Sequence, residues 1–181
     1  MEKIYKTIQE SEVLLSELML PSNSNFRGNV HGGYVLSLMD KIAFACASKH
    51  SKHYCVTASV DTVDFLNPIG IGELLTMKAS INYVGKSSMV VGIRVESENI
   101  QTGEKKHCNS SYFTMVAKDE KGMNAQVPGL ILRNENEKRR FIKCAHRLEA
   151  KKLKTKEFSK ADFVSAKYLD ELKKHNVQLV D

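Results

Sequence analysis

A long apolar segment is missing from this 181-residue chain, which has no hydrophobic run near the roughly 18–20 residues needed to cross a membrane. The first residues, Met1–Lys6, also lack the apolar stretch and small-residue cleavage site of a secretory signal. We therefore expect no membrane span and a cytoplasmic location. The hydrophobic share of 42% is enough for one domain with a buried core.

Cysteine is scarce, and its four residues follow no regular spacing. They are Cys46, Cys55, Cys108 and Cys144. In a cytoplasmic chain we expect free buried thiols rather than disulfides. Two of them lie close in sequence to His50 and His53, which suggests a zinc site. The group crosses the expected end of a helix, however, and lacks the spacing of a structural zinc site. We therefore expect no bound metal.

Internal repeats and low-complexity runs are absent, but the net charge of +6 is unevenly distributed. Residues 1–130 hold 13 Lys or Arg and 13 Asp or Glu, whereas residues 131–181 hold 14 and 8. We therefore expect a neutral domain over 1–130 and a basic, mostly helical extension over 131–181. Acidic residues are interspersed in the extension, which favours a solvated helix over one that binds nucleic acid.

The chain order predicts one strand, one long helix and then four strands. The expected ranges are 11–20 for the first strand, Tyr34–Lys49 for the helix, and Cys55–Leu66, Glu73–Val84, Ser88–Glu98 and Lys105–Ala117 for the others. The last four are rich in β-branched residues and each ends at a turn signal, which predicts an antiparallel sheet. A single helix covers one face, so we expect an α+β fold in which the sheet curls around the helix. In the extension we expect a helix over 131–153 and a second one from Ser159, capped with Asp162.

Adjacent glycines mark the start of the long helix, in the segment Gly28-Asn29-Val30-His31-Gly32-Gly33. Without side chains at Gly32 and Gly33, another group can approach the backbone closely. The first N–H groups of a helix have no intrahelical acceptor and carry the positive end of its dipole. They can bind a carbonyl oxygen that becomes negative during acyl transfer. The same glycines also suit a plain tight turn.

Asp40 lies at the edge of the apolar arc of this helix. The arc consists of Val35, Leu36, Met39, Ile42, Ala43, Cys46 and Ala47. Apolar neighbours raise the pKa of a carboxyl group and allow it to act as a general base. A partly solvated helix carboxylate with no chemical role is the alternative that the pattern leaves open.

Asn29 and Asp40 are separated by a mostly helical stretch, which predicts a distance of about 12–15 Å. Groups that far apart cannot act on one bond. If both take part, one protomer must supply the asparagine and its partner the aspartate. A two-fold dimer with antiparallel helices would form two such composite sites.

The same residues resemble a known family, the hot-dog acyl-CoA thioesterases, and most closely the cytosolic acyl-CoA hydrolases. The similarity runs from about Glu10 to Leu130. It is carried by Gly28–Gly33, Met39-Asp40 and Val56–Asp61, and later by Lys86–Met89 and Val127-Pro128. The resemblance implies a hot-dog fold and hydrolysis of fatty acyl-CoA to the free acid and coenzyme A. It also implies homohexamers built as trimers of dimers, and no cofactor beyond the coenzyme A of the substrate.

In that family the residues at the positions of Asn29 and Asp40 form the composite site across a dimer. By resemblance, Asn29 and the N–H groups of Gly32 and Gly33 hold the carbonyl and the attacking water. Asp40 then activates that water, or attacks directly to give a mixed anhydride. The expected contacts to substrate or coenzyme A are His31, Lys86, Ser87, Ser88 and Arg94. Lys86-Ser87-Ser88 is also a plain hairpin turn.

Two other functions are compatible with parts of the pattern. His31 suggests a hydratase or dehydratase, but the proline-rich approach expected before a dehydratase histidine is absent. An acyl-CoA sensor that regulates DNA binding would need an added helix-turn-helix, and only about ten residues precede the first expected strand. Asn29 and Asp40 are also both present. Hydrolysis is therefore the expected activity.

Overall fold

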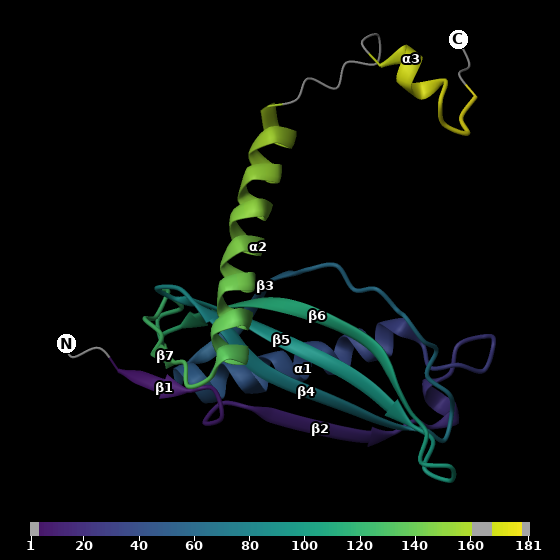
Figure 1. The fold of residues 1–181 in the computed structure, drawn as a ribbon, viewed down its shortest axis with the longest axis horizontal. Coiled ribbons are helices and arrows are strands. Elements are labelled where there is room, and N and C mark those ends of the chain that lie inside the picture. Colours follow the sequence, from purple (N-terminus) through teal and green to yellow (C-terminus); the bar gives the residue numbers. More distant parts are fainter. Residues whose placement is uncertain (1–3, 161–167, 179–181) are drawn as a thin grey trace. The chain divides into compact units, whose positions relative to one another are not determined.

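A computed structural model of the protein describes residues 4–160 and 168–178. The chain divides into a compact unit that ends at Cys144 and a second unit that begins at Ala145. Figure 1 traces the elements of both units. Within the described residues, no helix is long and apolar enough to cross a membrane.

The first unit contains α1, two sheets and the first turns of α2. Its elements are β1 (Tyr5–Thr7), β2 (Val13–Leu18), a 3-10 turn (Pro21–Asn23), α1 (Gly32–Ser51), β3 (Tyr54–Val60), β4 (Leu74–Val84), β5 (Ser88–Glu98), β6 (Lys105–Lys118), β7 (Gly129–Ile131) and the start of α2 (Glu135–Lys160). The main sheet is antiparallel, in the order β2-β4-β5-β6-β3, and a small second sheet pairs β1 with β7 in parallel. The predicted α+β plan, with a curled antiparallel sheet around one long helix, is confirmed (Figure 1).

The core lies between α1 and one face of the main sheet. Alternate residues of the central strands are fully buried, among them Met77 and Ile81 of β4 and Phe113 and Met115 of β6. Successive residues of a strand point to opposite faces, so the residues between them lie on the outer face of the sheet. All four cysteines are buried, and none of them is paired in a disulfide among the described residues, as the sequence predicted.

The strand predicted over Cys55–Leu66 ends earlier, at Val60. Its register with β6 shifts between Thr57 and Ser59. After the strand, the Ser111 hydroxyl donates to the Asp61 and Thr62 carbonyls and replaces part of the ladder. Residues 61–68 therefore follow β6 as an irregular segment, which carries several exposed apolar side chains.

Helix boundaries also differ from the prediction. Helix α1 begins at Gly32 and not at Tyr34, because the His31 side chain caps it. Helix α2 runs over Glu135–Lys160 and includes Ser159, so no second helix starts at that residue. Asp162, its expected capping partner, lies outside the described residues. The second unit also contains α3 (Leu169–Leu172).

The first turns of α2 pack on the compact unit. Glu137 is buried, accepting from Gln9 Nε2 at 2.8 Å and from the Arg133 backbone N–H at 2.6 Å. The Phe141 ring lies 5.0 Å from the ring of Tyr83 on β4. These contacts fix the start of α2 relative to the sheet.

A buried histidine joins three segments of the compact unit. His50, near the end of α1, is fully buried. Its Nδ1 lies 2.9 Å from the Ser11 hydroxyl, and its Nε2 lies 3.1 Å from the Pro128 carbonyl. The neutral ring satisfies both partners if Nε2 carries the proton and Nδ1 accepts from Ser11. Burial is the main cause that lowers the pKa of His50.

We expect the protein to lose stability as the pH falls from 7.5 to 5.5. The pKa of His50 is lower in the folded than in the unfolded chain, where it is about 6.5. Folding therefore favours the neutral ring. The contribution of His50 to the free energy of unfolding is lost as the pH falls below the pKa of the unfolded chain toward the lower pKa of the folded protein. Urea unfolding across this range measures the loss. His50→Gln should flatten the dependence, while His53→Gln, at an exposed position, should not change it. An unchanged slope in His50→Gln would contradict the assignment.

Candidate active site

The loop before α1 is organised by the side chain of Asn25. Its Oδ1 accepts from the backbone N–H groups of Arg27 at 2.8 Å and Asn29 at 3.2 Å. The Asn25 N–H in turn donates to the Asn29 carbonyl at 2.6 Å. Gly28 takes a positive φ of 79° between them, which suits a residue without a side chain. The loop is a fixed turn that presents two asparagines next to the helix N-terminus.

The two glycines that begin α1 differ in the hydrogen bonding of their N–H groups. Gly33 N–H donates to His31 Nδ1 at 3.0 Å. Among the described residues, Gly32 N–H has no hydrogen-bond acceptor. Of the two expected donors for a negative oxygen, Gly32 is therefore the one available in this conformation. His31 acts here as a helix cap.

Phe65 forms a wall beside this helix end. A Cβ placed on Gly32 would lie 3.2 Å from Phe65 Cζ, so the ring lies directly over the glycine. The residue is 51% exposed. With Asn25, Asn29 and Val35, it lines a hollow of about 430 Å³. The hollow combines polar amides, an available backbone N–H group and apolar walls, which suits a polar reacting group attached to an apolar chain.

Asp40 lies on a different surface of α1. The Thr57 hydroxyl on β3 donates to Asp40 Oδ1 at 2.6 Å, which fixes the carboxylate. Both residues are exposed in the single chain, and they line a second hollow of about 390 Å³ together with Phe44 and Tyr54. This hollow shares no lining residue with the one at Asn25. One chain therefore presents the asparagines and the aspartate in two separate hollows.

Strand β3, which carries Thr57, is the outermost strand on its side of the main sheet. No strand among the described residues pairs with its outer edge, and such an edge can pair with another strand. Exposed apolar residues lie on α1, on β3 and on the segment that follows β3: Leu36, Phe44, Tyr54, Val60, Phe65 and Leu66. An apolar border around an open strand edge and a fixed carboxylate is typical of an interface between subunits.

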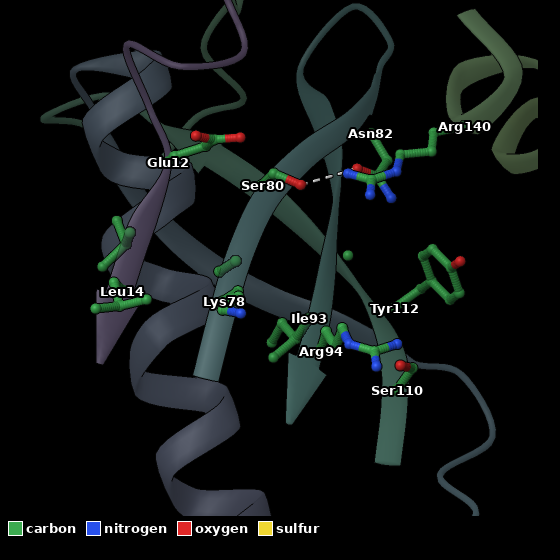
Figure 2. Close-up of a pocket in the computed structure, with 13 residues that line it drawn as sticks. Glu12, Leu14, Lys78, Ser80, Asn82, Ile93, Arg94, Ser110, Tyr112 and Arg140 are labelled. Atoms are coloured by element: carbon green, nitrogen blue, oxygen red, sulfur yellow. Dashed lines mark hydrogen bonds between the residues drawn. The ribbon is translucent and has the colours of Figure 1, made fainter. Parts of the chain in front are cut away.

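The remaining predicted residues lie elsewhere in the compact unit. Lys86-Ser87-Ser88 forms the hairpin turn between β4 and β5, held by backbone bonds from Val127 to the Lys86 carbonyl and from Ala117 to that of Ser87. Arg94 lies on the outer face of the sheet, where it pairs with Glu96 at 2.9 Å and lines a further hollow (Figure 2). In the part of the chain that the structure describes, these residues do not line the hollow at Asn29 or the hollow at Asp40.

Three residues of the two hollows were not predicted from the sequence to have a role there. Asn25 was assigned to a loop-breaking run, although an asparagine near a helix start is a common local hydrogen-bonding signal. Thr57 was assigned to a strand without a role, because its contact with Asp40 joins positions 17 residues apart. Phe65 was expected inside a strand. No local sequence pattern predicts the contact of Thr57 with Asp40 or that of Phe65 with the start of α1.

Comparison with known proteins adds the following findings. The family model described as the thioesterase superfamily matches residues 27–104. The chain is 43% identical over 155 residues to protein VdlD of Helicobacter pylori, covering 86% of this chain and 87% of that one. A solved structure named apo-hexameric acyl-CoA thioesterase superposes with a TM-score of 0.82 at 36% identity, over 84% of this chain and 97% of that chain.

An acyl-CoA hydrolase of Staphylococcus aureus is also similar, with a TM-score of 0.79 and 31% identity over 92% of this chain and 99% of that chain. That structure contains butyryl coenzyme A, coenzyme A and coenzyme A disulfide. The same hydrolase has been solved with one aspartate, one asparagine and one threonine each changed to alanine.

Proposed function

This chain belongs to the thioesterase superfamily, among the acyl-CoA hydrolases of the hot-dog fold, and we propose that it hydrolyses fatty acyl-CoA to a free fatty acid and coenzyme A. The observation that carries the proposal is the pair of half-sites, one with a fixed carboxylate and one with amides at a helix N-terminus. Hydrolysis of a thioester needs two groups, a base that activates water and a hydrogen-bond donor that stabilises the oxyanion.

The complete site forms between two chains in this proposal. Asp40 and Thr57 come from one protomer, and the hollow with Asn25, Asn29 and Gly32 comes from its partner. The separate half-sites in one chain and the free edge of β3 support a dimer of this kind. The hexameric state of the similar thioesterase supports further assembly, as a trimer of dimers. We place the reaction in the cytoplasm.

Two asparagines, Asn25 and Asn29, are candidates for the amide that stabilises the oxyanion. Asn29 is the residue that the family resemblance suggested. The aspartate and threonine changed in the Staphylococcus aureus hydrolase are seventeen positions apart, as are Asp40 and Thr57. The asparagine changed in that enzyme precedes its aspartate by fifteen positions, which is the spacing of Asn25 and not of Asn29. This spacing favours Asn25 as the catalytic amide, with Asn29 held against it.

The reaction follows from these positions. Thr57 occupies one oxygen of Asp40 and leaves the other to face water or the thioester carbon. Asp40 either takes a proton from the attacking water or adds to the carbonyl itself, forming an anhydride that water then cleaves. Gly32 N–H and an asparagine amide stabilise the oxyanion, and coenzyme A leaves as a thiolate that takes up the proton released from the water. No further cofactor enters this scheme. Lys86, Ser87, Ser88, Arg94 and His31 are the proposed contacts for the rest of coenzyme A.

The first test is release of free thiol from acetyl-, butyryl-, octanoyl- and palmitoyl-CoA, followed with a disulfide dye. At micromolar concentrations of the subunit, we expect a rate of turnover that is proportional to protein concentration. The protein's own thiols should give a small blank because they are buried, and burial raises the pKa of Cys46 to about 12. Binding of acyl-CoA without thiol release from any chain length would replace the hydrolase with an acyl-CoA sensor.

A further inference from the structure

Asn109 of β6 carries a fully buried amide that has no hydrogen-bond partner. Neither its Nδ2 nor its Oδ1 is bonded to any of the described residues, although its backbone carbonyl lies 2.9 Å from His107 Nε2. An amide buried in this way loses its hydrogen bonds to water without replacing them, so an apolar side chain of the same size would make the folded chain more stable. A ligand that supplies the missing hydrogen bonds explains such a residue.

A bulge in β6 turns this amide toward the inner face of the sheet. Cys108 is an extra residue of β6, between the positions that pair with Val95 and Glu96 of β5. Both Cys108 and Asn109 are fully buried, whereas neighbouring residues of a regular strand point to opposite faces. Asn109 therefore lies on the same face as Phe113, which belongs to the core between the sheet and α1.

The segment that follows β3 forms a wall between this amide and the hollow at the start of α1. Phe65 and Leu66 of the segment line that hollow. Leu66 N–H donates to the Cys108 carbonyl at 2.8 Å, next to Asn109. Two residues further along β6, the Ser111 hydroxyl donates to two carbonyls of the same segment. The wall is therefore bonded to β6 on both sides of Asn109. Its two apolar side chains are exposed, so they can move aside with little loss of buried area.

We propose that Asn109 selects acyl groups that carry a hydroxyl, so that hydroxyacyl-CoA thioesters are the preferred substrates; this inference rests on the proposed function and deepens it. In the proposed site the thioester carbonyl meets Gly32 N–H, and the acyl chain extends from there past Phe65, which lies over Gly32, toward β6. A hydroxyl both donates and accepts, so one group on the chain satisfies Asn109 Oδ1 and Nδ2 together. An unsubstituted chain brings only carbon to the amide and leaves it unpaired.

The test compares hydroxylated substrates with their unsubstituted parents. The pairs are butyryl-CoA with its 3-hydroxy form, and octanoyl-CoA with its 3-hydroxy and 8-hydroxy forms. For at least one pair, kcat/KM from thiol release should be about tenfold or more higher with the hydroxyl. Asn109→Leu should lower that ratio to about one, because leucine has no polar atom to pair. The same variant should unfold at a temperature no lower than the wild type, whereas the loss of a merely structural residue would lower it.

Asn82→Leu is the matched control, since it makes the same change at a buried asparagine that lines the hollow on the outer face of the sheet. It should keep the wild-type ratio. Asn109→Ala is a second variant in case leucine prevents folding, and it too should bring the ratio to about one. A ratio that stays high in both variants at Asn109 overturns the inference.

Affinity for the same pairs, measured by calorimetry in Asp40→Asn, reports the preference without turnover. Equal kcat/KM and equal affinity within every pair overturn the role of Asn109, while thiol release from butyryl-CoA leaves the proposed hydrolysis standing. Tighter binding of a hydroxylated form that Asn109→Leu abolishes, without thiol release from any substrate by the wild type, supports the selection by Asn109 and overturns the hydrolysis.

Discussion

Asp40→Asn should lower kcat for butyryl-CoA hydrolysis by about a hundredfold or more, the usual contribution of a general base. The amide keeps the size of the carboxylate and can still accept from Thr57, so the local structure is preserved. It cannot take a proton from water or attack the thioester. KM should change little, because the group acts on the transition state and not on the bound substrate. Steady-state thiol release measures both constants.

The matched control for Asp40→Asn is Glu120→Gln, the same change of a carboxylate to an amide at an exposed residue after β6. It should retain wild-type kcat. A variant at Asp40 that keeps most of its kcat would remove this residue from the chemistry. The base would then have to be sought elsewhere in the two half-sites.

Mixing two inactive variants should restore about a quarter of wild-type activity. Asn25→Ala and Asp40→Asn each damage both sites of their own homodimer. Random exchange makes half of the dimers mixed, and each mixed dimer contains one intact site and one doubly damaged site. One quarter of all sites is therefore intact. The measurement is thiol release from an equimolar mixture after dissociation and reassembly.

The arrangement of the site decides this result. If the asparagine and Asp40 act within one protomer, a mixed dimer has no intact site and the mixture stays inactive. Each variant taken alone through the same dissociation and reassembly is the control. Repeating the mixture with Asn29→Ala decides between the two asparagines. Only the true catalytic amide gives an inactive variant that Asp40→Asn rescues.

The fold was predictable where the local pattern and the packing agree. The predicted and observed ranges of β5 coincide over Ser88–Glu98, because its alternating residues are buried against α1 and both ends are turns. Strand β3 was predicted too long, since its last residues are polar or exposed and their carbonyls bind Ser111 instead of a strand partner. The three-residue strands β1 and β7 were missed, because a pairing that short has no period to detect.

The candidate site was predictable only in part. Asp40 was identified because a carboxylate at the edge of an apolar arc is a chemical anomaly within one helix. Its contact with Thr57 depends on how α1 crosses β3, which no short sequence window contains. The hollow on the outer face of the sheet collects residues from four strands and α2, and a Cβ on Gly92 would collide with Asn82 there. Such sites are properties of the packed sheet.

The open edge of β3 has a consequence for how much activity a cell obtains from each chain. If catalysis needs two protomers joined at this edge, a monomer has only half-sites and is catalytically inactive. Below the dissociation constant of the dimer, the rate then rises with the square of the subunit concentration. A small change in expression is amplified into a larger change in thioester turnover. A copy with one catalytic residue changed, made in the same cell, would likewise inactivate one of the two sites in each mixed dimer that it forms.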